Sequence, residues 1–427
     1  MAMRDATPQN ASPQNDAAPQ NASQGGTASR SGGPSCRNGM VPQSGTTFQN
    51  GAASRSDGLS PRDGATSRSD GPSRGGRVRR RVLLAAVPLL AAGAAGLLLR
   101  GNPTRGAVVS EAVDRTVPPG STLTPWGRPP AGAAIGSGVA VTGTGEVLLL
   151  HRGGGAFAAD RMMDVDPVVV LDAGTGEVTR SWGAGMFASP HGVSVDGKGR
   201  VWVTDVTTNH VTVFTGDGRL ERTIGHDYGF GLDTCLAVRN TLTNLRCTGD
   251  PYIFARPTDV VAGGNGRAFV SDGYRNSRVG VFDAAGRFAG AWGELGDRDG
   301  AFSIPHGIAL RGNGDVVVAD RRNARVQVFS ADGRHLATHS SAAIGRPYDV
   351  AVGPGDVLYV LDGGDALDEE GGRHRGYVVT LAGDGSVTRR WALADQDADP
   401  HQLAVGPAGE IYVAALNGPP LWRWAPR

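Results

Sequence analysis

Residues 190–220 read PHGVSVDGKGRVWVTDVTTNHVTVFTGDGRL, and this stretch decides the fold. It opens with a short alternating apolar run, a turn with Asp and Gly, and two runs rich in β-branched residues. An Asp-Gly turn then leads to a fourth run. Asp-Gly and Asn-Gly between alternating runs are strong signals for β-hairpins. The stretch therefore predicts four antiparallel strands.

The same pattern occurs six times, at intervals of about 40–65 residues. The other clear copies begin at Arg256, Pro305 and Arg346, and weaker copies begin at Gly136 and Pro400. Four antiparallel strands per repeat are typical of propeller blades, and no stretch after residue 101 has the apolar period of a helix. We expect an all-β fold, one six-bladed β-propeller over residues 101–427. Most of the 66 glycines in the chain would then lie at its turns.

The sixth repeat has only three evident strands before the chain ends at Arg427. We expect a fourth strand from the N-terminal side, within residues 107–117, to complete this blade. Closure of the ring in this way removes exposed sheet edges.

The balance of charge excludes some functions. Lys and Arg total 42, and Asp and Glu total 41. A nucleic-acid-binding protein usually has a basic excess, so we expect no nucleic-acid partner. Lys198 is the only lysine, which leaves little room for Schiff-base chemistry.

For the oligomeric state, we expect a monomer.

The first hundred residues predict a tail and a membrane segment. Residues 1–76 hold few large apolar side chains, so we expect them to be disordered. Within residues 77–100, four arginines precede an uncharged run at residues 82–99. Eighteen helical residues reach about 27 Å, close to the thickness of the bilayer core. The run is an uncleaved anchor in a bacterial cell membrane or a cleaved signal sequence. The propeller is expected outside the cytoplasm in both cases.

Of the three cysteines, Cys36 lies in the tail, and Cys235 and Cys247 lie 12 positions apart in one insertion. In an oxidising compartment the latter two would form a local disulfide bond. The alternative is two unpaired thiols.

Three histidines recur at the start of alternate repeats. His191, His306 and His401 each follow a proline in repeats two, four and six, whereas the other repeats have Ser137, Pro257 and Pro347 at this place. Equivalent positions in alternate blades of a six-bladed ring converge at the central channel. Three converging imidazoles would hold a zinc ion with one position open, the pattern of a catalytic site. The alternative is that these histidines only pack.

Beyond the general NHL-type repeat, several motifs have a narrower resemblance. The chain resembles the peptidyl-α-hydroxyglycine α-amidating lyase family over residues 136–420. The matching stretches are HRG at 151–153, SPHG at 189–192, WVTD at 202–205, PTDV at 257–260, SDGY at 271–274, NSR at 276–278, PH at 305–306 and ADR at 319–321.

The resemblance implies a carbon–nitrogen lyase of the peptidylamidoglycolate lyase type. Such an enzyme splits a peptidyl-α-hydroxyglycine into a peptide amide and glyoxylate. The resemblance further implies that the three histidines bind zinc, that Tyr274 is the base, that Arg152 holds the substrate carboxylate and that Arg321 is a second channel arginine. Without the family motifs, Tyr274 would be a packing residue, Arg152 a solvated strand end, and Arg321 a structural partner of Asp320.

The family also implies a structural calcium ion on the backbone carbonyls of Val139 and Val193. The family's calcium-binding aspartate corresponds to Gln402 here, which lacks the charge that gives most of the affinity. Asp399 stands where the family usually has methionine. The family's cystine beside the tyrosine is missing, since its two positions are Ala255 and Arg275.

Two other functions remain open. The propeller could be a non-enzymatic binding or sensor module outside the cytoplasm, or a calcium-dependent hydrolase of the lactonase type. The hydrolases use acidic and Asn residues in the channel, whereas this sequence places three histidines there. Zinc content distinguishes the lyase from the binding module. The substrate would be a small peptide or a related α-hydroxyglycine compound.

Overall fold

The computed structural model describes residues 115–239, 245, 247–367 and 373–427. The predicted tail at residues 1–76 and the predicted membrane segment at residues 77–100 lie outside this range. In the part of the chain that is described, no helix has both the length and the apolar character needed to cross a bilayer.

Four separate four-stranded antiparallel sheets follow one another along the chain. The first contains β2 (Gly136–Val141), β3 (Val147–His151), β4 (Val168–Leu171) and β5 (Val178–Trp182). The second contains β6 (Pro190–Val195), β7 (Val201–Asp205), β8 (His210–Phe214) and β9 (Leu220–Ile224). The third contains β10 (Asp259–Ala262), β11 (Ala268–Asp272), β12 (Arg278–Phe282) and β13 (Phe288–Trp292). The fourth contains β14 (Pro305–Leu310), β15 (Val316–Asp320), β16 (Arg325–Phe329) and β17 (His335–His339).

The remaining strands form one eight-stranded sheet, in the order β18-β19-β20-β21-β1-β24-β23-β22. One half contains β18 (Pro347–Gly353), β19 (Val357–Asp362), β20 (Tyr377–Leu381) and β21 (Val387–Leu393). The other half contains β22 (Pro400–Val405), β23 (Ile411–Ala415), β24 (Leu421–Trp424) and β1 (Thr122–Pro125). Within the described residues, the helical elements are α2 (Phe230–Arg239) and two 3₁₀ turns, η1 (Arg321–Asn323) and η2 (Pro354–Asp356).

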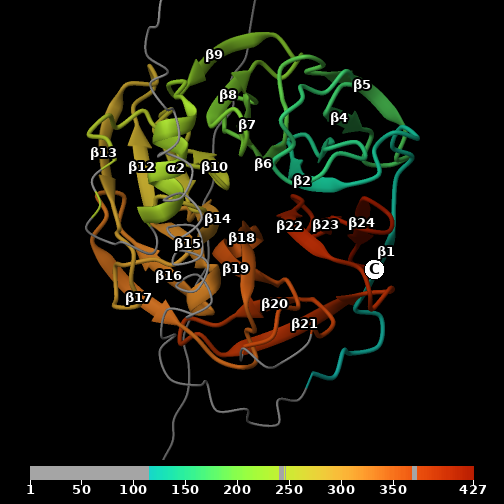
Figure 1. The fold of residues 1–427 in the computed structure, drawn as a ribbon. Coiled ribbons are helices and arrows are strands. Elements are labelled where there is room, and N and C mark those ends of the chain that lie inside the picture. Colours follow the sequence, from blue (N-terminus) through green and yellow to red (C-terminus); the bar gives the residue numbers. More distant parts are fainter. Residues whose placement is uncertain (1–114, 240–244, 246, 368–372) are drawn as a thin grey trace, which may run out of the picture. The chain divides into compact units, whose positions relative to one another are not determined.

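The first strands of the repeats form a closed ring around the centre (Figure 1). Strands β2, β6, β10, β14, β18 and β22 each contact the next, and β22 contacts β2. The predicted β-propeller is therefore confirmed. The six predicted repeats appear as six inner strands, although the last two groups share one hydrogen-bonded sheet through β1.

Strand β1 completes the last group, but not at the predicted residues. Thr124 and Pro125 pair antiparallel with Arg423 and Trp422 of β24, and Thr122 and Leu123 pair parallel with β21. Residues 115–117 form no strand, and residues 107–114 lie outside the described range. A strand from the N-terminal side does complete the group, about five residues later in the sequence than the predicted window.

Apolar side chains fill the space between neighbouring blades. Strands β3 and β4 are buried on both faces, and Leu148 and Val170 pack against Phe187 and Phe214 of the next repeat. A sheet covered on both faces needs continuous apolar strands rather than alternating ones. The outermost strand β5 is exposed along most of its length. This pattern leaves the repeated turns and strand ends of each blade at the ends of a tightly packed stack.

A buried aspartate at the end of the second strand positions the start of the first. Asp205 accepts hydrogen bonds from the backbone N–H groups of Ala188 and Ser189, both at 2.8 Å. Equivalent bonds run to Asp272, Asp320 and Asp362 in the next three repeats. Burying a carboxylate is costly unless it is hydrogen-bonded. The VTD and VAD motifs therefore fix the segment that leads into each inner strand, including the one that carries His191.

Candidate metal and catalytic centre

His191, His306 and His401 lie together at the starts of the inner strands β6, β14 and β22. Their ring centroids are 4.5 to 5.0 Å apart. One ligand nitrogen from each lies within 4.8 Å of the other two, and all three side chains are buried. The structure thus brings together the three histidines that the sequence singled out.

Each histidine is oriented by a carbonyl oxygen of the next repeat. The Nδ1–H groups of the three rings donate to Thr258, Tyr348 and Ser137, at 2.7, 2.8 and 2.6 Å respectively. This bond selects the tautomer in which Nε2 keeps its lone pair. The accepting residues also correct the sequence alignment, because Thr258 and Tyr348 occupy the histidine position in repeats three and five, not Pro257 and Pro347.

Burial keeps these imidazoles neutral. It lowers the pKa of His191 and His306 well below the usual value, and the neighbouring histidine charges act in the same direction. It lowers the pKa of His401 to about 3. Neutral imidazole is the form that ligates metals. At neutral pH, the three Nε2 atoms are therefore available to a cation.

The Tyr274 hydroxyl lies 3.1 Å from Nε2 of His191 and 3.2 Å from Nε2 of His306. A tight contact places it there: a Cβ on Gly273 would lie 1.8 Å from the carbonyl oxygen of Pro305, so only glycine fits. Burial raises the pKa of Tyr274, while Arg321 and Arg152 lower it. Burial is the largest of these effects on the Tyr274 pKa, and the tyrosinate that the sequence predicts for the zinc-bound form stays a prediction.

Arg152 is 5% exposed. Its Nε donates to the carbonyl oxygen of Pro190 at 3.2 Å. Its Nη2 is buried and has no hydrogen-bond partner among the described residues. Arg152 is therefore not a solvated strand end, and the unpaired nitrogen suits a carboxylate ligand.

Arg321 does not pair with Asp320, which was the structural alternative considered for it; it has other partners. Its guanidinium stacks on the Tyr348 ring at 3.7 Å, donates to the Tyr348 hydroxyl and pairs with Asp365 at 3.0 Å. Asp320 instead pairs with Arg325 at 2.7 Å. Arg321 is thus held near Tyr274 by groups other than Asp320.

Phe157 and Arg256 also surround the centre, and the sequence analysis missed both. The Phe157 ring lies 5.1 Å from the Tyr274 ring and 6.3 Å from the His191 ring. The guanidinium groups of Arg152 and Arg256 lie 5.5 and 5.6 Å from the Phe157 ring centroid. Phe157 lies outside every repeated strand, so no periodic signal marks it. Arg256 immediately precedes the PTDV motif and could have been found there.

The three predicted calcium positions are linked by hydrogen bonds. Oε1 of Gln402 accepts from the backbone N–H groups of Val139 and Val193, at 3.1 and 3.2 Å. Its Nε2 donates to Asp259 at 3.1 Å. Gln402, Asp259 and Asp349 line a cavity of about 10 Å³ beside the histidines. Burial raises the pKa of Asp259 to about 7, and burial together with the nearby Asp259 carboxylate raises the pKa of Asp349 well above its usual value. The side-chain amide of Gln402 is thus fully engaged, with two backbone N–H groups on its oxygen and Asp259 on its nitrogen.

Asp399, which replaces the usual methionine, is ion-paired. Its backbone N–H donates to Asn417 at 2.6 Å, and its carboxylate pairs with Arg373 at 2.7 Å. The charge at this position is therefore balanced within the protein.

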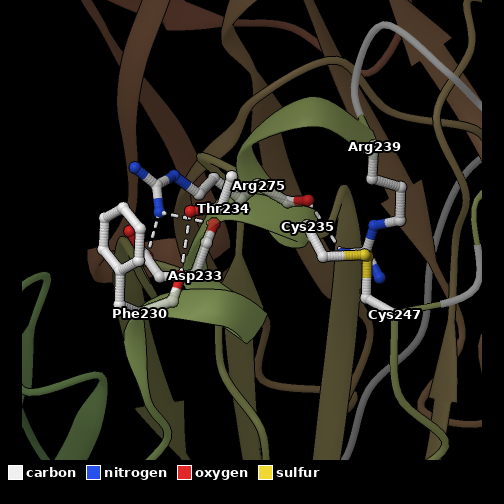
Figure 2. Close-up of a disulfide and its surroundings, with 7 residues drawn as sticks. All are labelled: Phe230, Asp233, Thr234, Cys235, Arg239, Cys247 and Arg275. Carbon is white, nitrogen blue, oxygen red and sulfur yellow. Dashed lines mark hydrogen bonds and ion pairs between the residues drawn. A yellow bond between two sulfur atoms is a disulfide. The ribbon is translucent and has the colours of Figure 1, made fainter. Parts of the chain in front are cut away.

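The predicted disulfide is confirmed. Cys235 of α2 is bonded to Cys247, with Cα atoms 5.7 Å apart (Figure 2). The same helix contacts Arg275: Asp233 forms an ion pair with it, and Arg239 donates to its carbonyl oxygen at 2.8 Å. The backbone N–H of Arg275 donates to Ala255 at 3.1 Å. The two positions of the missing cystine are therefore adjacent, and α2 contacts one of them.

Comparisons with known proteins match this architecture. The NHL repeat model matches residues 187–214 and 302–329. Peptidyl-alpha-hydroxyglycine alpha-amidating lyase 1 of Drosophila melanogaster is 31% identical over 271 residues, 58% of this chain and 47% of the fly protein. The chain resembles the amidating lyases. Peptidyl-glycine alpha-amidating monooxygenase B of Xenopus laevis is 29% identical over 316 residues, 68% of this chain and 34% of the frog protein.

This chain thus spans about a third of the length of the amphibian monooxygenase and about half of the fly lyase. Among solved structures, a streptogramin B lyase is 13% identical, with a TM-score of 0.47 over 70% of this chain and 96% of that one.

Proposed function

We propose that this chain is a zinc-dependent lyase. It would cleave the C–N bond of a peptidyl-α-hydroxyglycine, or of a related carbinolamide, to release an amide and glyoxylate. One observation carries the proposal: the Tyr274 hydroxyl lies within hydrogen-bond distance of the Nε2 atoms of two of three clustered, neutral histidines. The resemblance to named amidating lyases supports the same reaction class.

The residues at the centre fit zinc. Three imidazole nitrogens within 4.8 Å of one another match a His₃ site with a fourth position for substrate. A zinc ion at this position would supply a Lewis acid for the hydroxyl oxygen of the substrate. The Nδ1 bonds to backbone carbonyls would hold the three rings in place for it.

Tyr274 is the proposed base. In its ionised form it would take the hydroxyl proton of the substrate as the C=O bond of glyoxylate forms. The electron pair of the breaking C–N bond goes to the amide nitrogen, and the proton on Tyr274 is then passed to that nitrogen. The charges of Arg321 and Arg152, which lower the Tyr274 pKa, favour the phenolate that this role needs.

The two arginines have separate roles in the proposal. Arg152 would bind the carboxylate of the substrate through its unpaired Nη2. Arg321, held by Asp365 and Tyr348, would supply positive charge to Tyr274. Neither arginine needs to move a proton.

The proposal extends to the location of the propeller, its oligomeric state and calcium. The disulfide supports an oxidising compartment, so we place the propeller outside the cytoplasm, anchored in the membrane by residues 82–99 or secreted after cleavage. We propose a monomer. Calcium at Val139, Val193 and Gln402 would have to displace the Gln402 hydrogen bonds.

The test is glyoxylate release by the full-length protein from α-hydroxyhippurate or an α-hydroxyglycine-extended peptide. Tyr274→Phe should lower kcat/KM by about 10²-fold or more, and chelation should abolish activity until zinc is returned. Tyr359→Phe is the matched control, because Tyr359 lies in β19, in the middle of a blade. Glyoxylate release that survives both chelation and Tyr274→Phe contradicts the mechanism. Protein that holds no zinc and releases no glyoxylate, but binds peptide, supports the binding-module alternative.

A further inference from the structure

A second cavity, of about 270 Å³, lies beside the candidate centre. Its lining includes Ala158, Thr207, Tyr228, Phe230, Asp233 and Arg256. These residues come from the loop after β3, the turn after β7, the start of α2 with the segment before it, and the segment that leads into β10. The volume is sufficient for one large amino-acid side chain.

Phe157 connects the centre with this cavity. Its ring contacts the Tyr274 and His191 rings, it directly precedes the cavity-lining Ala158 in the sequence, and the residue is 45% exposed. Arg152 and Arg256 lie 5.5 and 5.6 Å from the ring centroid, so the two guanidinium carbons are at most about 11 Å apart, the length of roughly three extended residues. A peptide whose carboxylate lies at Arg152 could therefore pass over Phe157 and reach Arg256.

Two side-chain polar atoms that line the cavity, both hydroxyl oxygens, lack a hydrogen-bond partner in the described part of the chain, and each can donate to a bound acceptor. No carboxylate lies within ion-pair distance of the Arg256 guanidinium in the described ranges, because Asp233 pairs with Arg275. The hydroxyls of Tyr228 and Thr207 are buried, with no hydrogen-bond partner among the described residues. Phe230 at the rim is 86% exposed.

We infer that this cavity binds an acidic side chain of the peptide substrate. The side chain would belong to one of the two residues that precede the hydroxyglycine. A carboxylate accepts hydrogen bonds from both hydroxyls and pairs with Arg256. An apolar side chain would leave the two hydroxyls without hydrogen-bond partners. A basic side chain would be repelled by the positive charge of Arg256. The inference rests on the proposed function for the identity of the substrate, but not for the binding of the acid.

The experiment compares α-hydroxyglycine-extended tripeptides that carry Glu, Gln or Lys at each of the two preceding positions. The full-length protein should release glyoxylate from a Glu peptide with a kcat/KM about tenfold above that for the matched Gln peptide, and higher again than for Lys. Arg256→Gln should bring the Glu-to-Gln ratio close to one. Tyr228→Phe should lower the ratio about threefold. The ratio is the readout because Arg256 also lies near Tyr274.

Arg287→Gln is the matched control. It removes the same charge from an exposed hairpin turn, where Arg287 pairs with Asp283, and it should leave the ratio unchanged. Calorimetric titration with N-acetylated tripeptides ending in ordinary glycine, which cannot be cleaved, adds a measurement that needs no catalysis. The Glu tripeptide should bind more tightly than the Gln tripeptide, and Arg256→Gln should remove the difference.

The outcomes separate the two proposals. Tighter binding of the Glu tripeptide with no glyoxylate from any hydroxyglycine peptide supports the acid site and contradicts the lyase. Equal kcat/KM and equal binding for Glu and Gln peptides overturn the acid site and leave the lyase standing.

Discussion

Asp233 of α2 forms an ion pair with Arg275, the residue that directly follows Tyr274 (Figure 2). Arg239, six residues further along the same helix, donates to the Arg275 carbonyl oxygen. The Cys235–Cys247 disulfide lies between these two contacts in the helix sequence. Helix α2 is thereby connected to the backbone next to the proposed base.

Loss of this connection should affect catalysis more than stability. An ion pair of this kind contributes about 1 kcal/mol or less, but a small displacement of Tyr274 changes its distance to His191 and His306. Arg275→Ala is expected to lower kcat for glyoxylate release by about three- to tenfold, with a midpoint of thermal unfolding close to wild type. Steady-state kinetics and calorimetry measure both.

Removal of the disulfide tests the same connection independently. Cys235→Ser combined with Cys247→Ser should lower kcat in the same direction as Arg275→Ala. Arg219→Ala, at an exposed turn where Arg219 pairs with Asp217, is the control and should leave kcat unchanged. An unchanged kcat in both the Arg275 and the double-cysteine variants would mean that α2 does not position Tyr274.

The zinc content should depend on all three clustered histidines. His306→Ala removes one of three proposed ligands, and we expect bound zinc to fall from about one ion per chain to near zero, since the backbone carbonyls that orient the rings cannot replace a ligand. His339→Ala is the control, because His339 lies on the outer strand β17. Elemental analysis of the purified proteins measures this, and full zinc retention in His306→Ala would refute the site.

Gln402→Asp should create a calcium-dependent protein. The change would place a third carboxylate beside the buried Asp259 and Asp349, which is unfavourable unless a cation binds. Without calcium we expect a lower midpoint of unfolding than wild type. Calcium at about 100 times its Kd should restore about 2.7 kcal/mol.

Differential scanning calorimetry with and without calcium checks this prediction. Gln396→Asp makes the same change at an exposed loop position and should show no calcium dependence. A wild-type protein that gains as much stability from calcium as Gln402→Asp would show that the amide already holds the ion.

Asp205→Ala should destabilise the second repeat and disturb His191. The substitution removes the acceptor of four backbone N–H bonds, from Ala188, Ser189, Thr207 and Thr208. Buried donors without a partner cost about 1–3 kcal/mol each, so we expect a loss of at least about 3 kcal/mol in the free energy of unfolding. Chemical denaturation measures it, with the exposed Asp217→Ala as the comparison. A loss below about 1 kcal/mol would show that these bonds are replaced by water.

The repeat pattern was sufficient to predict the propeller, the convergence of the three histidines and the disulfide, because each follows from a local motif or a fixed period. The sequence analysis placed Pro257 at the histidine position, one residue too early. Pro257 is equivalent to the proline of the PHG motif, and Thr258 is equivalent to its histidine. The N-terminal strand was placed too early, since β1 has only four residues and no turn signal in common with the repeats. Phe157 lies in a loop whose position depends on the packed blades, which no local pattern encodes.

Strand β1 also constrains the order of folding. It pairs with β21 and β24, so its partners are made about 270–300 residues later in synthesis. At 5–20 residues per second this delay is roughly 15–60 s. During that time, the buried Leu123 and the free edge of β1 have no native partner. The ring can therefore close only after the last strand has emerged, and a chain truncated before Leu421 would leave both β1 and β23 open to pairing with other chains.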